Sequence, residues 1–268
     1  MIKNSGESSH RPTALITGAS SGLGAAFARV FAQHGYDLIL VARDKERLAN
    51  LAAELQHNFG IQVILMVKDL SLETSPTEIH AELQARGVVL EVLVNNAGLI
   101  GYGKFHETDI RRELEMIRVN LLALTLLTKL FLPGMVARGR GRILNLGSTG
   151  SFVASPLNAV YSATKAYVLS FSEAIAEELD GTGVTVTALC PGAVRTELQT
   201  RGGMQDVRLL QRGVLQAGEV AEQGYRALMA GRRVLVPGLG NQLQIFMARF
   251  LPRRLVVKGA EAMLQRTR

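Results

Sequence analysis

A tyrosine and a lysine lie four positions apart in the segment YSATKAYVLSFSEAIAEEL, at Tyr161 and Lys165. The apolar residues of this segment recur at helical spacing, and a helix places two such residues on one side, one turn apart. A phenol titrates near pH 10, so a neighbouring ammonium would favour the phenolate at lower pH. The pair is therefore either surface decoration or an acid and base couple, and other parts of the sequence must distinguish the two.

A glycine-rich stretch, TGASSGLG, follows the apolar run TALIT and precedes a helical pattern. Its glycines allow a tight turn and let backbone N–H groups approach a pyrophosphate at the positive end of the next helix. We therefore predict a dinucleotide site here; the alternative is a glycine turn without a ligand. The residues assigned to the site from this stretch are Gly18, Ser20, Ser21, Gly22, Leu23 and Gly24.

The end of the second apolar run indicates which dinucleotide is bound. An acidic residue there would accept hydrogen bonds from the adenosine ribose and favour NAD. The stretch LVARDKERL instead places Ala42 and Arg43 at this edge. A guanidinium cannot accept such bonds, but its fork suits a 2′-phosphate. We predict NADP(H) in preference to NAD(H); the alternative is that Arg43 caps a surface turn, and Asp44 could partly neutralise it.

The elements that must position these residues follow a regular alternation. Short apolar runs appear as TALIT, DLILVA, QVILMV, EVLVNN, GRILNL, GVTVTALC and RRVLVPG. Helical patterns lie between them, near residues 22–34, 45–59, 77–85, 110–136, 161–179 and 220–230. Continuous apolar strands separated by helices predict a parallel sheet covered on both faces. We expect a doubly wound α/β fold.

The composition indicates a single globular domain with a large core. Of the 268 residues, 47% are hydrophobic and 20% charged, which argues against disorder. Five scattered histidines and the single Cys190 suggest neither a metal site nor a disulfide framework, and Cys190 itself is expected in the core. The polar start of the chain and the brevity of TALIT do not resemble a signal peptide, so we expect a cytoplasmic protein.

The most apolar longer segment is NLLALTLLTKLFLPGMVA. A membrane-spanning helix needs about 20 consecutive apolar residues. Lys129 and the Pro133-Gly134 pair interrupt this segment. A buried helix is therefore the better interpretation.

Positive charge is concentrated in the C-terminal quarter. Residues 195–268 hold 13 Lys and Arg against 5 Asp and Glu, although the whole chain has a net charge of only +7. Such a region could attract nucleic acid, anionic lipid or an acidic substrate. It has no interleaved aromatic residues and no DNA-binding motif, so we expect a solvated face and no nucleic-acid partner.

The tail contains an amphipathic pattern that requires a packing partner. Its apolar positions are Leu243, Phe246, Met247, Phe250 and Leu251, before Pro252 breaks the helix. The nearby cations are Arg249, Arg253, Arg254 and Lys258. We expect this helix to pack within a homodimer or homotetramer. It could instead lie on an anionic membrane surface or fold over the substrate pocket.

Taken in order, several motifs resemble the short-chain dehydrogenase/reductase superfamily over about residues 12–237. They are TGASSGLG, NNAG at residues 95–98, Ser148, Tyr161 with Lys165, and Pro191-Gly192. The resemblance implies one Rossmann-type catalytic domain at 12–237 with a parallel sheet of about seven strands. Residues 238–268 would then form an extra C-terminal amphipathic helix. The implied activity is NAD(P)-dependent exchange of hydride with a carbonyl or an alcohol.

The resemblance also implies a role for each catalytic residue. Tyr161 is the general acid and base, and Lys165 is its electrostatic partner and binds the nicotinamide ribose. Ser148 orients the substrate carbonyl and stabilises its developing charge. Asn120 holds a water that connects the lysine to solvent; alternatively, it is a core asparagine that satisfies backbone groups.

Further cofactor contacts come from the same resemblance. They are Asp69 and Leu70 at the adenine, Asn96, Ala97 and Gly98 at its ribose, Pro191 and Gly192, Val194 and Thr196 at the carboxamide, and Tyr161 with Lys165. Asp69 could equally cap the helix that follows it.

The substrate is not specified by these motifs. The predicted pocket residues are Tyr102, Phe105, Leu198, Met204, Val207, Leu209 and Leu210, in a loop and in the 197–217 stretch. They suggest a lipophilic carbonyl such as a steroid-like ketone or a fatty 3-oxoacyl group, or they are packing residues. Two other functions remain open: a dinucleotide-binding redox sensor, for which loss of Tyr161 or Lys165 would have been the sign, and a membrane-surface-associated reductase of lipids.

Overall fold

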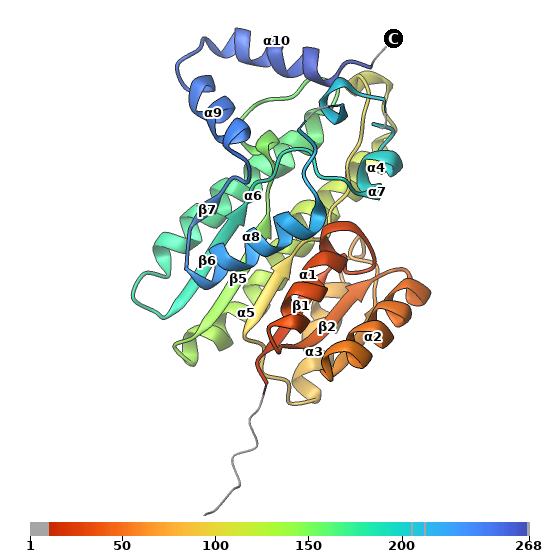
Figure 1. Cartoon of the computed structure of the whole chain (residues 1–268), viewed down its shortest axis with the longest axis vertical. Helices are drawn as coiled ribbons and strands as arrows, with labels where there is room; N and C mark the ends of the chain where they lie inside the picture. Colours follow the sequence, from red (N-terminus) through yellow and green to blue (C-terminus); the bar gives the residue numbers. More distant parts are fainter. Residues whose placement is uncertain (1–10, 205, 212, 267–268) are drawn as a thin grey trace, which may run out of the picture.

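The computed structural model describes residues 11–204, 206–211 and 213–266, and they form a three-layer α/β fold (Figure 1). A parallel sheet has the strand order β3-β2-β1-β4-β5-β6-β7. Its strands are β1 (Thr13–Thr17), β2 (Asp37–Ala42), β3 (Val63–Val67), β4 (Val92–Asn95), β5 (Gly141–Leu146), β6 (Val184–Leu189) and β7 (Val234–Leu235). The strand order reverses between β1 and β4, and such a reversal creates a crevice at the carboxyl ends of the strands. The predicted doubly wound sheet of seven strands is confirmed.

Helices cover both faces of the sheet. The α-helices are α1 (Gly22–Gln33), α2 (Lys45–Phe59), α3 (Ser75–Ala85), α4 (Ile110–Ile117), α5 (Leu124–Ala137), α6 (Ala159–Glu178), α7 (Glu197–Arg201), α8 (Ala217–Met229), α9 (Leu239–Ala248) and α10 (Arg253–Leu264). Short helical turns are η1 (Phe105–Glu107), η2 (Arg118–Ala123), η3 (Thr149–Ser151) and η4 (Arg208–Leu210). Helices α1, α2 and α8 pack on one face, and α3, α5 and α6 pack on the other.

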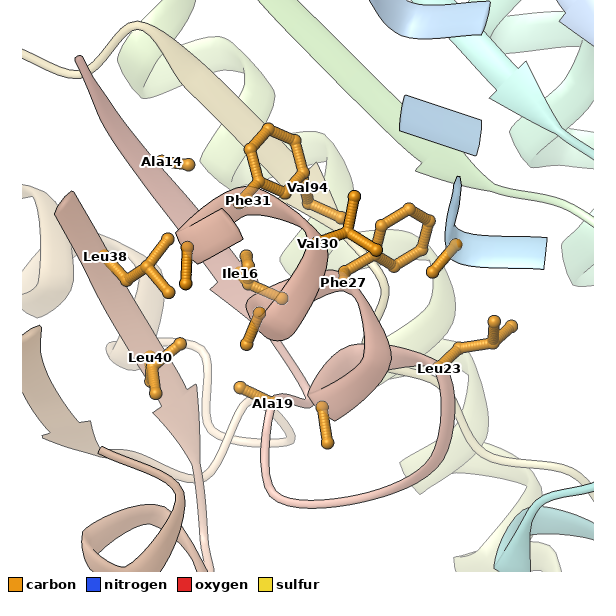
Figure 2. Packing of buried hydrophobic residues seen from close by; sticks show 14 of the residues in the cluster. Ala14, Ile16, Ala19, Leu23, Phe27, Val30, Phe31, Leu38, Leu40 and Val94 are labelled. Carbon is orange, nitrogen blue, oxygen red and sulfur yellow. The ribbon is translucent and has the colours of Figure 1, made fainter. Parts of the chain in front are cut away.

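Alternate residues of each central strand belong to different cores. In β1, Ala14 and Ile16 face the α1 side, while Leu15 faces the α5 side. Figure 2 shows the first of these cores, with Phe27 and Phe31 of α1 packed over the strands. Because both faces of β1 are covered, all five of its residues are buried, which explains the continuous apolar run in the sequence.

A row of buried polar side chains joins β4, β5 and α6. The Asn95 amide donates to Asn145 Oδ1 at 2.9 Å and to Thr128 Oγ1 at 3.1 Å. The Asn145 amide in turn donates to Ser172 Oγ at 3.0 Å. These four residues, which we call the amide row, are buried, so each hydrogen bond is protected from water. The row links the strand that leads to the active site with the helix that carries Tyr161.

Helices α4 and α5 are continuous through the π-helical turn η2. Among the described residues, this 28-residue stretch has the length and hydropathy (1.7) that a membrane span requires. Of its most apolar window, 44% is buried inside the protein. Leu127, Phe131 and Met135 pack against the sheet, so the stretch is a core helix, in line with the interpretation from sequence.

The tail differs from the sequence prediction. We expected one C-terminal amphipathic helix, but the chain forms two, α9 and α10, separated at Pro252. Proline has no N–H to donate and has a fixed φ, so it interrupts α9 but is well suited to the start of a new helix. The division into a catalytic domain at 12–237 and an extension at 238–268 stays a prediction.

Candidate active site and dinucleotide groove

Tyr161 and Lys165 lie on one face of α6, in its first two turns. The Lys165 Nζ atom is 5.7 Å from the centroid of the Tyr161 ring. Lys165 is only 3% exposed, and its ammonium donates a hydrogen bond to the Leu146 carbonyl at 2.6 Å. A buried lysine held in this way is not surface decoration, so the first of the two interpretations is wrong.

The titration of the pair differs from what we expected. Burial raises the pKa of Tyr161 to about 12, although hydrogen bonding with Ser148 opposes the shift. Burial lowers the pKa of Lys165 to about 8. Desolvation disfavours the charged form of each group, and it is the largest cause of both shifts. Tyr161 is therefore a protonated acid at neutral pH.

Ser148 lies two residues after the end of β5 and is the N-cap of η3. Its Oγ accepts a hydrogen bond from the Gly150 N–H at 3.1 Å, which fixes the hydroxyl and leaves its own proton to donate. The neighbouring Ser151 hydroxyl donates to the Lys165 carbonyl at 2.7 Å and accepts from the Ser148 N–H. Ser151 thus ties η3 to α6 and is a positioning residue that the sequence analysis missed.

Asn120 lies in the π-helical turn η2, a feature often found at functional sites. Its Oδ1 accepts a hydrogen bond from the Leu99 N–H at 2.8 Å. Its Nδ2 donates to the Leu99 carbonyl at 3.0 Å and also to Thr164 Oγ1. These bonds match the alternative of a core asparagine that satisfies backbone groups. A Cβ atom on Gly98 would lie 3.4 Å from Asn120 and 3.6 Å from Lys165 Nζ, so the two side chains converge at this glycine. The water-holding role stays a prediction.

A polar groove of about 630 Å³ runs along the carboxyl ends of β1, β2 and β4. Most residues that the sequence assigned to the cofactor line it: Gly18, Ser20, Ser21, Gly22, Leu23, Arg43, Asp69, Leu70, Asn96, Ala97, Gly98, Tyr161, Lys165 and Thr196. Lys68 and Arg201 also line it and were not predicted. Their signal in the sequence was weak, because exposed cations are common on any surface.

The loop before α1 fits a pyrophosphate. Gly18 and Gly22 have φ values of 66° and 55°, which glycine adopts without strain. The first turn of α1 has no acidic residue, and Ser21 at its N-cap makes no side-chain capping bond. The N–H groups at this helix end are therefore free of such caps, and the helix dipole favours an anion.

Four assigned residues do not line the groove: Gly24, Pro191, Gly192 and Val194. A Cβ atom on Gly24 would lie 2.1 Å from the Gly18 carbonyl oxygen, so this glycine allows close packing of α1 on the loop. Pro191 accepts a bond from Thr149 N–H at 2.9 Å, Val194 is buried, and Gly192 lines a different cavity. Direct contact between these four residues and the cofactor stays a prediction.

The environment of Arg43 bears on the choice of dinucleotide. Asp44, and not Arg43, caps the following helix, because its carboxylate accepts from the Arg47 N–H at 3.0 Å. Arg43 lies 3.0 Å from Glu115 and 3.7 Å from Asp69, so it is already partly neutralised. Burial alone would raise the pKa of Asp69, but the Ser71 N–H and the Arg43 charge hold it below its ordinary value. Asp69 also accepts the Ser71 N–H within a local turn, but it does not cap the following helix, whose N-cap is Thr74, so that alternative is wrong.

An apolar pocket of about 350 Å³ opens beside the groove, with Ser148 and Tyr161 in its wall. Among the described residues, no charged side chain lines it. Met204, Leu209 and Leu210 line it as predicted, whereas Tyr102, Phe105, Leu198 and Val207 do not. The other wall comes from α9 and α10, through Ile245, Ala248, Leu251, Leu255, Val256, Gly259, Ala260 and Met263. The tail therefore folds over the pocket, one of the three positions considered from the sequence.

Tyr161 is the residue where the two cavities meet. It lines both of them, while Lys165 lines only the groove and Ser148 only the pocket. Cys190 is fully buried behind this junction, and burial raises the pKa of its thiol to about 11. It is therefore an inert core residue, as expected. No cluster of metal-ligating side chains is found among the residues the structure describes.

Comparison with known proteins identifies the family. The model of the short chain dehydrogenase family matches residues 12–205. This chain belongs to that family. The shared fold and the junction of groove and pocket at Tyr161 thus belong to a short-chain dehydrogenase, an oxidoreductase, and the resemblance drawn from the motifs is confirmed.

Individual relatives of this short-chain dehydrogenase differ in what they act on. It is 41% identical to the NADP-dependent 3-hydroxy acid dehydrogenase of Salmonella typhi, over 67% of this chain and 71% of that protein. It is 33% identical to the human very-long-chain 3-oxoacyl-CoA reductase, over 69% of this chain but 60% of that longer protein. A short-chain dehydrogenase from Sphingobium yanoikuyae in complex with NADPH superimposes with a TM-score of 0.80 at 35% identity, covering 89% of this chain and 94% of that one.

Proposed function

We propose that this short-chain dehydrogenase transfers hydride between NADP(H) and a neutral lipophilic carbonyl or its secondary alcohol, with a 3-oxoacyl group as the substrate class. The observation that carries the proposal is the apolar pocket at Ser148 and Tyr161, which has no charged lining residue in the described part of the chain. Burying a carboxylate without a partner is costly, so the pocket favours an uncharged chain beside the carbonyl. Among the relatives, the 3-oxoacyl-CoA reductase is named for this substrate class, whereas the 3-hydroxy acid dehydrogenase is named for a charged substrate, so the two differ on this point.

The residues at the junction would divide the work as follows. The dinucleotide, when bound, supplies or accepts the hydride. Ser148, whose oxygen is held by the Gly150 N–H, donates a hydrogen bond to the carbonyl oxygen of the substrate and keeps its proton. Tyr161 is protonated at neutral pH and gives its proton to the developing alkoxide.

Lys165 would replace the proton that Tyr161 gives up. Its pKa of about 8 lies below that of Tyr161, so transfer from the ammonium to the phenolate is downhill. The hydrogen bond to Leu146 keeps Nζ at the inner end of the groove, where the family resemblance expects the nicotinamide ribose. Asn120 would then link this lysine to solvent through a water.

Support for NADP(H) over NAD(H) comes from the groove. Arg43 at the end of β2 supplies a cation for a 2′-phosphate; Lys68 and Arg201 line the same groove but are ion-paired with Glu78 and Glu197. Glu115 competes for the Arg43 guanidinium, and a phosphate would have to displace it. The Sphingobium relative was solved with NADPH.

A homodimer or homotetramer is also part of the proposal. Ile110, Leu114 and Leu122 on the 110–137 helix and Tyr167 on α6 are exposed large apolar side chains, and α4 and α6 contact each other. Such a patch is typical of an interface between subunits. We further propose a cytoplasmic location, since the single buried thiol gives no disulfide framework.

A matched set of substrates tests the function. The methyl ester of a medium-chain 3-oxo acid, the free acid and the coenzyme A thioester would be assayed with NADPH and with NADH. We expect the ester to exceed the free acid by about tenfold or more in kcat/KM, because the acid would bring an unpaired charge into the pocket. Faster turnover of the free acid would contradict the proposed substrate, and turnover with NADH alone would contradict the cofactor.

The thioester adds a second comparison. A cavity adjoining the pocket shares Thr149 and Gln244 with it and is also lined by the exposed Arg208. The phosphates of a carrier group could reach this cation while the acyl chain remains in the pocket. Arg208→Gln should therefore lower kcat/KM for the thioester by about fivefold and leave the ester unchanged.

A further inference from the structure

The helices α9 and α10 form a hairpin at one end of the molecule, which we call the C-terminal hairpin (residues 239–264). Figure 1 shows it beyond the carboxyl ends of β5, β6 and β7. Both ends are fixed to the protein: the Asn241 amide donates to Pro237 O at 2.7 Å, and the Tyr102 hydroxyl donates to Leu264 O at 2.7 Å. The turn between the helices, residues 249–252, is exposed. The hairpin is thus anchored at its ends and projects at its middle.

One face of α9 is apolar and exposed. Leu239, Leu243 and Phe246 follow one another at i, i+4 and i+7, so these exposed side chains share one stripe of α9. Phe250, in the turn after α9, is 69% exposed and extends the stripe, because its ring centroid lies 5.1 Å from that of Phe246. The opposite side of α9, with Ile245 and Ala248, faces the pocket. The face of α9 that packs on the protein is therefore the pocket side, and the exposed stripe faces away from it.

Cations flank the apolar stripe. They are Arg249, Arg253, Arg254 and Lys258, all exposed, with Glu261 as the one acidic residue of the hairpin. Within the described ranges, none of the four cations has an ion-pair partner, although most other exposed arginines of the chain are paired. The projecting part of the hairpin is thus both apolar and positively charged.

The exposed surface is continuous with the apolar pocket. Met247, Leu251 and Leu255 line the pocket and are also about half exposed to solvent. A lipophilic molecule could therefore pass between the exposed stripe and Tyr161 along an apolar path. This arrangement suits a site that receives its ligand from an apolar phase.

We infer that the C-terminal hairpin docks on an anionic membrane surface, with the stripe of Leu239, Leu243, Phe246 and Phe250 at the acyl boundary and the four cations at the headgroups. Interfacial helices combine a bulky apolar face with Lys and Arg in this way. A second copy of the chain fits less well, because a two-fold interface would bring the four cations against their own copies with one acid to offset them. Membrane docking is separate from the proposed reaction, and vesicle binding can be measured without an activity assay.

Vesicle flotation of the full chain tests the inference. We expect it to float with phosphatidylglycerol vesicles, at least about tenfold less with phosphatidylcholine vesicles, and less again when the salt concentration rises from about 0.05 to 0.5 M. Leu243→Ser should reduce binding about tenfold. The matched control is Leu72→Ser, the same change at a leucine that is 58% exposed but distant from the hairpin in sequence; it should bind normally.

A second pair of variants tests the charge. Arg253→Gln with Arg254→Gln should reduce flotation about tenfold, whereas Lys129→Gln with Arg232→Gln, two exposed cations outside the hairpin, should not. Circular dichroism and the melting temperature would verify that each variant is folded. No flotation, or equal losses in the hairpin variants and controls, would overturn the inference. So would a dimer in sedimentation velocity that Leu243→Ser dissociates, since the stripe would then face a second copy.

Discussion

The polar groove and the apolar pocket share Tyr161 but are built in different ways. Charged side chains line the groove, among them Arg43, Lys68, Asp69 and Lys165. No charged side chain among the described residues lines the pocket. The groove comes mainly from the segments that follow β1, β2, β3 and β4, with further residues from α6 and α7, whereas the pocket combines the η3 region, the 197–217 stretch and the C-terminal hairpin.

The groove would therefore determine specificity for the dinucleotide, and the pocket specificity for the substrate. Fixed strand ends hold the groove, so its chemistry is set by short motifs and suits one invariant ligand. The pocket depends on segments that are attached to the sheet only at their ends, and its walls can change without moving Tyr161. The same hydride chemistry can thus serve different substrates through changes in the pocket alone.

The strongest test removes the residue that the two cavities share. Tyr161→Phe keeps the aromatic ring but removes the hydroxyl group that carries the proton. We expect kcat to fall by about 10²–10⁴-fold. Because the ring still separates groove and pocket, the dissociation constant for NADPH should be unchanged. Stopped-flow turnover and fluorescence titration of NADPH would measure the two quantities. Loss of NADPH binding in this variant would show that the cavities are not independent on either side of Tyr161.

The pH dependence sharpens the role of that residue. Oxidation of the alcohol needs the phenolate, and the pKa of Tyr161 is raised to about 12 by burial. The logarithm of kcat/KM for oxidation should therefore rise with a slope near one, about 100-fold between about pH 7 and 9. Reduction needs the protonated form and should be flat up to about pH 8, where Lys165 loses its proton. A plateau for oxidation beginning near pH 7 would mean that the free enzyme already holds a phenolate.

A charge reversal in the groove should affect the dinucleotide alone. Arg43→Glu is expected to lower kcat/KM for NADPH by about ten- to a hundredfold, because a charge-assisted bond to the 2′-phosphate is replaced by repulsion. Turnover with NADH should not fall, and the KM for the carbonyl should stay the same. The control is Arg29→Glu, at an arginine that is also exposed and ion-paired but lies outside the groove. Equal losses for NADPH and NADH would remove the 2′-phosphate argument.

The smallest effect is expected in the pocket. Gly259 of α10 lines it, and a Cβ atom there would meet no other atom within 4 Å. Gly259→Leu should fill space and lower kcat/KM about fivefold for a long 3-oxo ester, but not for a short one. Gly240→Leu is the control, at a helical glycine with equal room outside the pocket. If long and short esters suffer equally, the acyl chain does not lie along α10.

The sequence predicted the groove better than the pocket, for physical reasons. TGASSGLG and Asn96 work through backbone geometry at strand ends, where a local motif determines the structure. Arg43 was placed at the groove correctly, but its contact with Glu115 joins residues 72 positions apart in the chain. Such a long-range partner leaves no trace in a local pattern.

The catalytic residues show the same division. Tyr161 and Lys165 were singled out by their types and spacing and Ser148 by the family resemblance, and their catalytic roles stay predictions; the pKa of Tyr161 depends on burial, which the spacing does not give. The hairpin was partly foreseen, since its apolar period was visible in the sequence. That period could not show which face of α9 turns to the pocket or that a second helix follows Pro252.

The amide row described above helps to fix the position of α6 relative to β5, and therefore the geometry of the candidate active site. Ser172 is eleven residues beyond Tyr161, about 16 Å along α6, while Asn145 is three residues before Ser148 on the strand side. The bond between Asn145 and Ser172, together with the bonds that Ser151 and Lys165 make between α6 and the end of β5, therefore sets how far the phenol stands from the serine hydroxyl. A slip of α6 by one residue would displace the phenol by about 1.5 Å, and misplacement by about 1 Å can cost about 100-fold in rate. A hydrogen bond deep in the core thus helps to position the side chains that would carry out chemistry several helical turns away.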